Sequence, residues 1–125
     1  MKYSESEEMY LETILILENH TPNVRSVDIA NELGYSKASI SVAMKRLKEK
    51  GYIAMGDSAA ICLTEKGRQT AMRVYERHHL LTQFFTSIGA DSMVAEENAC
   101  RIEHVISPEL VEIIRGHLHT EPQTV

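Results

Sequence analysis

The amino-acid sequence predicts a mainly α-helical protein that carries one small two-stranded β-hairpin. Apolar residues recur at helical spacing through most of the 125 residues, and only residues 52–63 change to short strand-like runs. Glycine, proline and asparagine separate these segments. The length suits one domain or two small helical units with a modest core.

The first predicted helix covers residues 4–19. Its apolar side chains follow helical spacing, acidic residues occupy its first turn, and Ser4 or Ser6 is expected to cap it. The Thr-Pro-Asn sequence at residues 21–23 ends it.

Two helices joined by a tight turn are expected next. Residues 26–33 predict a short helix capped by Ser26, and residues 34–35 supply the turn. Ser36 caps the following helix over residues 37–50, which ends at a Lys-Gly pair.

The hairpin and a long helix follow. Residues 52–55 and 60–63 read as short strands, and the Gly-Asp-Ser sequence at 56–58 lies between them. Thr64 caps a helix that continues to about residue 87.

The last part of the chain predicts two more helices after a break at residues 89–91. One covers residues 92–106, and Ser107-Pro108 opens the other, because proline is well suited to the first helical turn. The expected boundaries are an N-terminal domain over residues 1–70, a helical domain over residues 71–119 and a flexible tail over residues 120–125.

The order helix, turn, helix, hairpin, helix is typical of a winged helix-turn-helix, in which the second helix of the pair enters the DNA major groove. Small polar residues and cations at the start of that helix suit contacts with bases and phosphates. The tip of the hairpin, residues 57–59, carries no base, so no strong minor-groove contact is expected there. The predicted DNA-binding residues are Arg25, Ser36, Lys37, Ala38, Ser39, Ser41, Lys45 and Arg46.

Charge is distributed unevenly along the chain. The formal net charge is −5, but residues 21–89 hold ten bases and six acids, whereas the segments on either side are acidic. This pattern favours a local DNA footprint over a general nucleic-acid coat protein. No long apolar run predicts a membrane span, no signal peptide is expected, and two widely spaced cysteines form no disulfide framework. These features predict a cytoplasmic protein.

A second constellation suits a metal ion. Cys100, Glu103 and His104 lie at positions i, i+3 and i+4, so a continuous helix would present them on one face. Met9 and Glu12 form another i, i+3 pair, and His78 is a further candidate. Thiolate, thioether, carboxylate and imidazole all bind first-row metals. The alternative is that these residues are ordinary core and surface side chains.

With these motifs together, the chain resembles the diphtheria toxin repressor and manganese transport regulator family. The matching stretches are residues 8–14, 27–30, 36–41, 63–67, 77–78 and 99–107.

The resemblance implies a metal-activated repressor of metal-homeostasis genes that binds operator DNA as a homodimer through its C-terminal helices. It implies Fe²⁺ or Mn²⁺ as the cofactor, with Co²⁺, Ni²⁺ or Zn²⁺ able to substitute in vitro. Iron-type members carry the residues found here at Met9, Cys100, Glu103 and His104. Manganese-type members carry acids in place of Met9 and Cys100, and match Glu12, Glu103, His104 and His78.

The sequence departs from the family pattern in two respects. Thr82 and Glu96 stand where iron-type members place a glutamate and a histidine of a second metal site. The chain is also expected to be a short form without the SH3-like domain of longer members.

Three other functions fit parts of this sequence. One is a winged-helix transcription factor that senses a small organic ligand or redox state through Cys62 or Cys100, without metal. A metal-dependent hydrolase with Glu103 as base is disfavoured, because the sequence has no Gly-rich phosphate cradle and no nucleophile elbow. An architectural DNA binder is disfavoured by the negative net charge.

Overall fold

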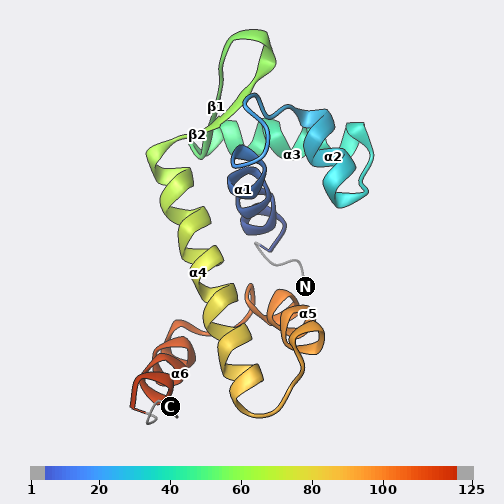
Figure 1. Cartoon of the computed structure of the whole chain (residues 1–125). Coiled ribbons are helices and arrows are strands. Elements are labelled where there is room, and N and C mark those ends of the chain that lie inside the picture. Colours follow the sequence, from blue (N-terminus) through green and yellow to red (C-terminus); the bar gives the residue numbers. More distant parts are fainter. Residues whose placement is uncertain (1–4, 121–125) are drawn as a thin grey trace. The chain divides into compact units, whose positions relative to one another are not determined.

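The computed structural model describes residues 5–120. Over this range the chain is mainly α-helical with one antiparallel hairpin, as the sequence predicts (Figure 1). The elements are α1 (Glu5–Glu18), α2 (Ser26–Leu33), α3 (Lys37–Glu49), β1 (Ile53–Met55), the short 3-10 turn η1 (Asp57–Ala59), β2 (Ile61–Leu63), α4 (Glu65–Ser87), α5 (Ser92–Ile102) and α6 (Pro108–Thr120).

The chain divides into two compact units between Arg73 and Val74. The N-terminal unit holds α1, α2, α3, the hairpin and the start of α4, and the C-terminal unit holds the rest of α4 with α5 and α6. The domain limits 1–70 and 71–119 stay a prediction. Of the tail predicted over residues 120–125, Thr120 ends α6 and the remainder lies outside the described residues, as does the predicted cap Ser4.

The start of α2 differs from the prediction. Ser26 is already the first helical residue, and the cap position belongs to Arg25, whose backbone is extended. The carboxylate of Asp28 accepts the backbone N–H of Arg25 at 2.8 Å. An acid at the third helical position can reach back to the cap in this way, so Asp28 stabilises the start of α2 and Ser26 does not act as its cap. Gly34 then ends the helix in the left-handed conformation, with φ of +73°.

Helix α3 begins and ends as the sequence predicts. The hydroxyl oxygen of Ser36 accepts the backbone N–H of Ser39 at 3.1 Å, which caps the helix. Its inner face is apolar and buried, with Ile40, Met44 and Leu47 at helical spacing. Gly51 follows the helix with φ of +83°.

The hairpin pairs its strands in the register Ile53 with Leu63, and Ile61 donates its N–H to the carbonyl of Val24 at 2.7 Å. Gly67, in the first turns of α4, lies against the same region. A Cβ built there would fall 2.0 Å from the carbonyl oxygen of Tyr52, so only glycine allows this approach. These contacts fix the hairpin to the helices of the N-terminal unit.

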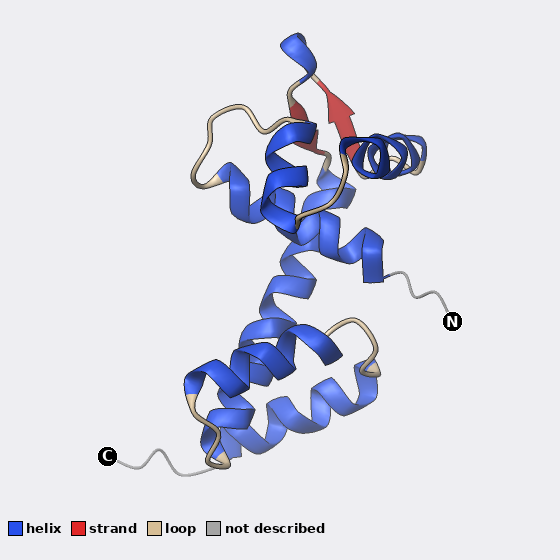
Figure 2. Ribbon diagram, turned by 90° about the vertical axis from the view of Figure 1, so that its right-hand side faces the viewer, coloured by secondary structure: helices blue, strands red, loops and turns tan. Residues whose placement is uncertain are grey.

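Each unit has its own apolar core, and the strands belong to the N-terminal one (Figure 2). The N-terminal core is formed by buried side chains from α1, α2, α3, both strands and α4. In the C-terminal unit, α5 and α6 pack on the later part of α4 around the buried residues Leu80, Leu81, Ala99, Val111 and Ile114. Over residues 5–120, no helix combines the length and the low polarity that a membrane span requires.

The fifth helix is shorter than predicted. The sequence predicts a helix over residues 92–106, but α5 ends at Ile102, and Glu103 caps its C-terminus. Arg77, from α4, donates a hydrogen bond to the carbonyl of Glu103, which satisfies one of the acceptors exposed at a helix end. Ser107 then caps α6 through the N–H of Leu110 at 3.1 Å.

Candidate metal centre and DNA-binding surface

A buried carboxylate organises the polar residues of the C-terminal unit. The side chain of Glu103 is 1% exposed. One of its oxygens, Oε1, lies 2.7 Å from Nδ1 of His78, and the other, Oε2, lies 3.3 Å from Nε2 of His104. The structure therefore brings three of the six predicted ligands together in one unit.

The second oxygen of Glu103, Oε2, is buried without a hydrogen bond from any described residue. In the described part of the chain, no group makes a hydrogen bond to Oε2, although His104 lies within ion-pair distance. A buried ionised oxygen without such a partner costs several kcal/mol unless a cation compensates it. Carboxylate and imidazole donors suit divalent first-row metals, so the residues present fit the ion that the family resemblance implies.

Cys100 and Glu103 stay in helical phase. Glu103, at the C-terminal cap of α5, keeps right-handed helical dihedral angles, with φ of −60° and ψ of −24°, and its N–H bonds the carbonyl of Ala99. The common face of Cys100, Glu103 and His104 stays a prediction. Cys100 lies on α5 and is exposed, Glu103 occupies the cap position, and His104 follows in a turn, partly buried. The three residues are neighbours in the chain but differ in exposure.

Two further candidates lie on α1, in the N-terminal unit. Met9 and Glu12 are one helical turn apart, and both are partly buried. The hydroxyl of Thr13 donates to the carbonyl of Met9 at 2.7 Å. The candidate ligands are thus divided between the two units, two in the first and four in the second.

The two departures from the iron-type second site are visible in the C-terminal unit. Thr82 donates its hydroxyl to the carbonyl of His78 at 2.9 Å, and Glu96 is exposed on α5.

The predicted DNA-binding residues are all exposed on the helix-turn-helix or just before it. Ser36 differs from the others because its hydroxyl caps α3 and also donates to the hydroxyl of Ser39 at 3.0 Å. Val42, which is not among the predicted DNA-binding residues, is 60% exposed in the middle of α3. The sequence carries a signal for this exposure: buried residues 40, 43 and 44 define one side of the helix, and the helical period places residue 42 on the opposite side.

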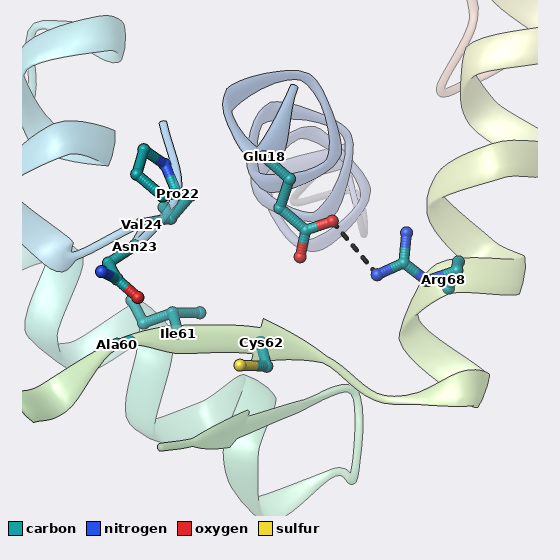
Figure 3. A pocket seen from close by; sticks show the side chains of 8 residues that line it. All are labelled: Glu18, Pro22, Asn23, Val24, Ala60, Ile61, Cys62 and Arg68. Carbon is teal, nitrogen blue, oxygen red and sulfur yellow. Dashed lines mark hydrogen bonds and ion pairs between the residues drawn. The ribbon is translucent and has the colours of Figure 1, made fainter. Parts of the chain in front are cut away.

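A hollow of about 330 Å³ lies beside the hairpin in the N-terminal unit (Figure 3). Its rim carries an ion pair in which the Arg68 guanidinium lies 3.1 Å from the Glu18 carboxylate. Cys62 also borders it, but alternation along β2 places this side chain opposite the buried Ile61 and Leu63. The thiol is therefore exposed and lies outside the core.

Comparison with known proteins identifies both parts of the chain. Residues 2–59 match the family described as "Iron dependent repressor, N-terminal DNA binding domain". Residues 64–123 match the family described as "Iron dependent repressor, metal binding and dimerisation domain". An uncharacterised helix-turn-helix transcriptional regulator of Methanocaldococcus jannaschii is 32% identical over 115 residues, which are 90% of this chain and 91% of that protein. The chain belongs to the diphtheria toxin repressor and manganese transport regulator family.

Two other relatives agree with this assignment. The diphtheria toxin repressor of Corynebacterium glutamicum is 32% identical over 120 residues, covering 92% of this chain and 52% of the relative. The solved structure of a manganese-dependent transcriptional repressor in complex with manganese is 28% identical, with a TM-score of 0.81 over 93% of this chain and 53% of that one. The chain therefore spans about half the length of these two relatives.

Family membership confirms the predicted fold and the general class of function. The diphtheria toxin repressor family consists of metal-dependent transcriptional regulators, with a DNA-binding domain followed by a domain for metal binding and dimerisation. None of the comparisons supports the alternative of a metal-free sensor of organic ligands or redox state.

Proposed function

We propose that the chain is a metal-activated transcriptional repressor that binds operator DNA as a homodimer and controls metal-homeostasis genes. The observation that carries this proposal is Glu103, a buried carboxylate with two imidazoles beside it and one oxygen that lacks a hydrogen bond among the described residues. A structural ion pair would be expected to satisfy both oxygens. An exposed basic recognition helix in the other unit supplies the DNA-binding function.

The proposed ligand set joins donors from both units. It consists of Met9, Glu12, His78, Cys100, Glu103 and His104. When bound, the divalent ion supplies a positive charge shared by these donors. The set mixes a soft thiolate and thioether with harder carboxylates, so we propose Fe²⁺ or Mn²⁺ as the cofactor and expect Co²⁺, Ni²⁺ or Zn²⁺ to substitute in vitro.

Control of DNA binding follows from the charges on the two units. Residues 1–20 hold five acids and one base, and residues 90–125 hold seven acids and two bases. Without a cation, the ligands of α1 gain nothing from those of the C-terminal unit. Once these charges are compensated, the two donor groups hold one relative position. Two recognition helices in a dimer then match half-sites separated by about one helical turn of DNA, or a multiple of it.

The dimer requires an apolar surface, and the C-terminal unit offers one. Large apolar side chains remain exposed on α5, on α6 and in the loop before α5, and such side chains are typical of protein interfaces. They are Ile88, Met93, Val94, Leu110 and Ile113. We propose that a second copy of the chain covers part of this surface.

The proposed role is regulatory and not catalytic, and its DNA partner implies a cytoplasmic location. If the purified chain hydrolysed simple esters or phosphates when metal was added, the hydrolase alternative would return.

The direct test is fluorescence anisotropy of a dye-labelled duplex from the promoter region of the chain's own gene. The duplex is titrated with protein at fixed salt in Mn²⁺, anaerobic Fe²⁺, Co²⁺ or Zn²⁺, and in chelator. We expect at least one metal to raise the affinity about tenfold or more, because couplings of this kind amount to roughly 1–3 kcal/mol, and chelation to reverse the effect. Equal binding in chelator would overturn the proposal and favour a metal-free sensor.

Variants identify the ligands. The double change Cys100→Ala and His104→Ala is expected to abolish the response to metal and chelator. His78→Ala is expected to weaken it. The matched control is His79→Ala, because His79 is the exposed neighbour of His78 and its ring lies 4.5 Å from that of Tyr75, outside the proposed set. Normal metal dependence in the double variant would refute the assignment of these ligands.

A further inference from the structure

The outward face of the recognition helix has an apolar centre. Ile40, Met44 and Leu47 define the buried side of α3, and the line directly opposite carries Ala38, Val42 and Lys45 at i, i+4 and i+7. Ala38 is exposed and Val42 is 60% exposed, the highest exposure among the large apolar side chains of the described helix-turn-helix. Neither residue contributes to a core.

Polar residues and cations flank this centre on both sides. Lys37, Ser41 and Lys48 lie along one flank of α3, and Ser39 and Arg46 lie along the other. All five are exposed. A helix inserted in the major groove turns its centre to the base edges and its flanks to the two phosphate backbones, so this charge pattern matches the geometry of the groove.

One flank also contains a hollow that suits a phosphate. It has a volume of about 290 Å³ and is lined by Tyr10, Ser39, Val42, Ala43 and Arg46. A guanidinium and a serine hydroxyl are both frequent phosphate donors. Burial, followed by the neighbouring Tyr35, raises the pKa of Tyr10 against the opposing effect of Arg46, so its hydroxyl keeps its proton at neutral pH. A phosphate held here would bring Val42 next to the base edges.

We propose that Val42 determines operator specificity by contacting the C5-methyl group of a thymine in each half-site. This inference rests on the proposed function, because it requires the recognition helix to enter the major groove. A valine side chain can neither donate nor accept a hydrogen bond, so it cannot read the polar groups of a base. The thymine methyl is the one apolar group that a natural base pair presents in the major groove. Cytosine at the same place leaves Val42 facing an amino group without a partner.

The expected effect is set by the burial of one methyl group. Loss of such a contact reduces affinity about fourfold in one half-site, and about 15-fold when both half-sites of a dimer lose it. The two losses are measured in the same metal and at the same salt, because the phosphate contribution to affinity depends on salt.

The experiment uses the full chain with the metal that gives the highest affinity. A preferred duplex is selected from a randomised pool, and each thymine of its half-sites is replaced in turn by deoxyuridine, which lacks the methyl group and keeps the same hydrogen-bonding groups. Val42→Ala is measured on every duplex. Val27→Ala serves as the matched control, because Val27 is 40% exposed on α2, away from the outward line of α3.

We expect one thymine position at which deoxyuridine lowers the DNA affinity of the parent protein and of the Val27→Ala variant. The affinity of the Val42→Ala variant should be the same with thymine and with deoxyuridine at that position. Val42 is exposed, so its replacement by alanine keeps the thermal unfolding midpoint within a few degrees. The inference is wrong if deoxyuridine has no effect at any position, or if Val42→Ala shows the same loss as the parent. Metal-independent DNA binding by the parent protein would instead refute the proposed function, so the two failures are distinguishable.

Discussion

Replacement of Glu103 by glutamine distinguishes a metal ligand from a structural ion pair. Glutamine has nearly the same size and shape, so it fits the buried position, but it carries no charge. Its amide oxygen can accept from His78 and its amide nitrogen can donate towards His104, at the places now occupied by Oε1 and Oε2. The substitution therefore removes the charge that we assign to the metal and retains the hydrogen bond to His78.

The magnitude follows from the two oxygens. The hydrogen bond to His78 weakens from a charge-assisted to a neutral one, a loss of about 1 kcal/mol. The burial cost of the charged Oε2, about 1–3 kcal/mol or more, disappears. Without metal, the free energy of unfolding should therefore stay within about 1 kcal/mol of the parent value, or rise. If Glu103 instead formed a purely structural ion pair, breaking it would cost about 3–5 kcal/mol.

Thermal unfolding with and without metal measures both quantities. At a metal concentration of about 100 times the dissociation constant, the parent protein should gain about 2.7 kcal/mol, or roughly 10 °C in its unfolding midpoint. A 100-fold loss of affinity in Glu103→Gln reduces this gain to about 0.4 kcal/mol. A variant that is strongly destabilised without metal, yet still stabilised by it as much as the parent, would refute the reasoning.

Four other changes test the fold and the DNA-binding surface. Gly67→Ala should destabilise the chain by about 2 kcal/mol or more, because its Cβ would meet the carbonyl of Tyr52, whereas Gly116→Ala in α6 meets nothing within 4 Å and should stabilise it by up to about 1 kcal/mol in thermal unfolding. Ser36→Ala removes the cap of α3 and should cost about 1 kcal/mol in denaturant unfolding; an unchanged midpoint would contradict the capping role. Arg46→Gln should lower the slope of log affinity against log salt by about two units on any sequence, one for each protomer of the dimer, and an unchanged slope would exclude a phosphate contact.

Local signals in the sequence predicted the helix starts that depend on neighbouring residues. Ser36 and Thr64 were expected as caps, and each accepts a backbone N–H three residues along the chain. Gly34 was expected in the turn and adopts the left-handed conformation there. In these cases the residue that determines the structure lies within the same few residues, so a reading of the sequence alone is sufficient.

The errors arose where the determining group lay elsewhere or had two possible roles. The end of α5 depends on Arg77, which is 26 residues before the carbonyl that it binds, and no local pattern reports that contact. At α2, Ser26 is a common cap residue, but the cap position belongs to Arg25, whose N–H is accepted by Asp28 from inside the helix. Val42 is not predicted from residue type, because DNA contacts are expected of polar residues and core positions of apolar ones, although the helical phase places Val42 outside the core.

The division of the candidate ligands between two units has an energetic consequence. Each unit has its own apolar core, so neither core depends on residues of the other for its packing. Neither unit therefore needs the metal in order to fold. If the donors of α1 and those around Glu103 bind one ion, the free energy of metal binding instead holds the two units in one relative orientation. Thermodynamic linkage then makes the effect reciprocal. If metal raises the affinity for DNA by a certain factor, DNA that binds the metal-held orientation must raise the affinity for metal by the same factor. A regulator whose metal merely stabilised one unit would show higher thermal stability with metal and no such reciprocal gain.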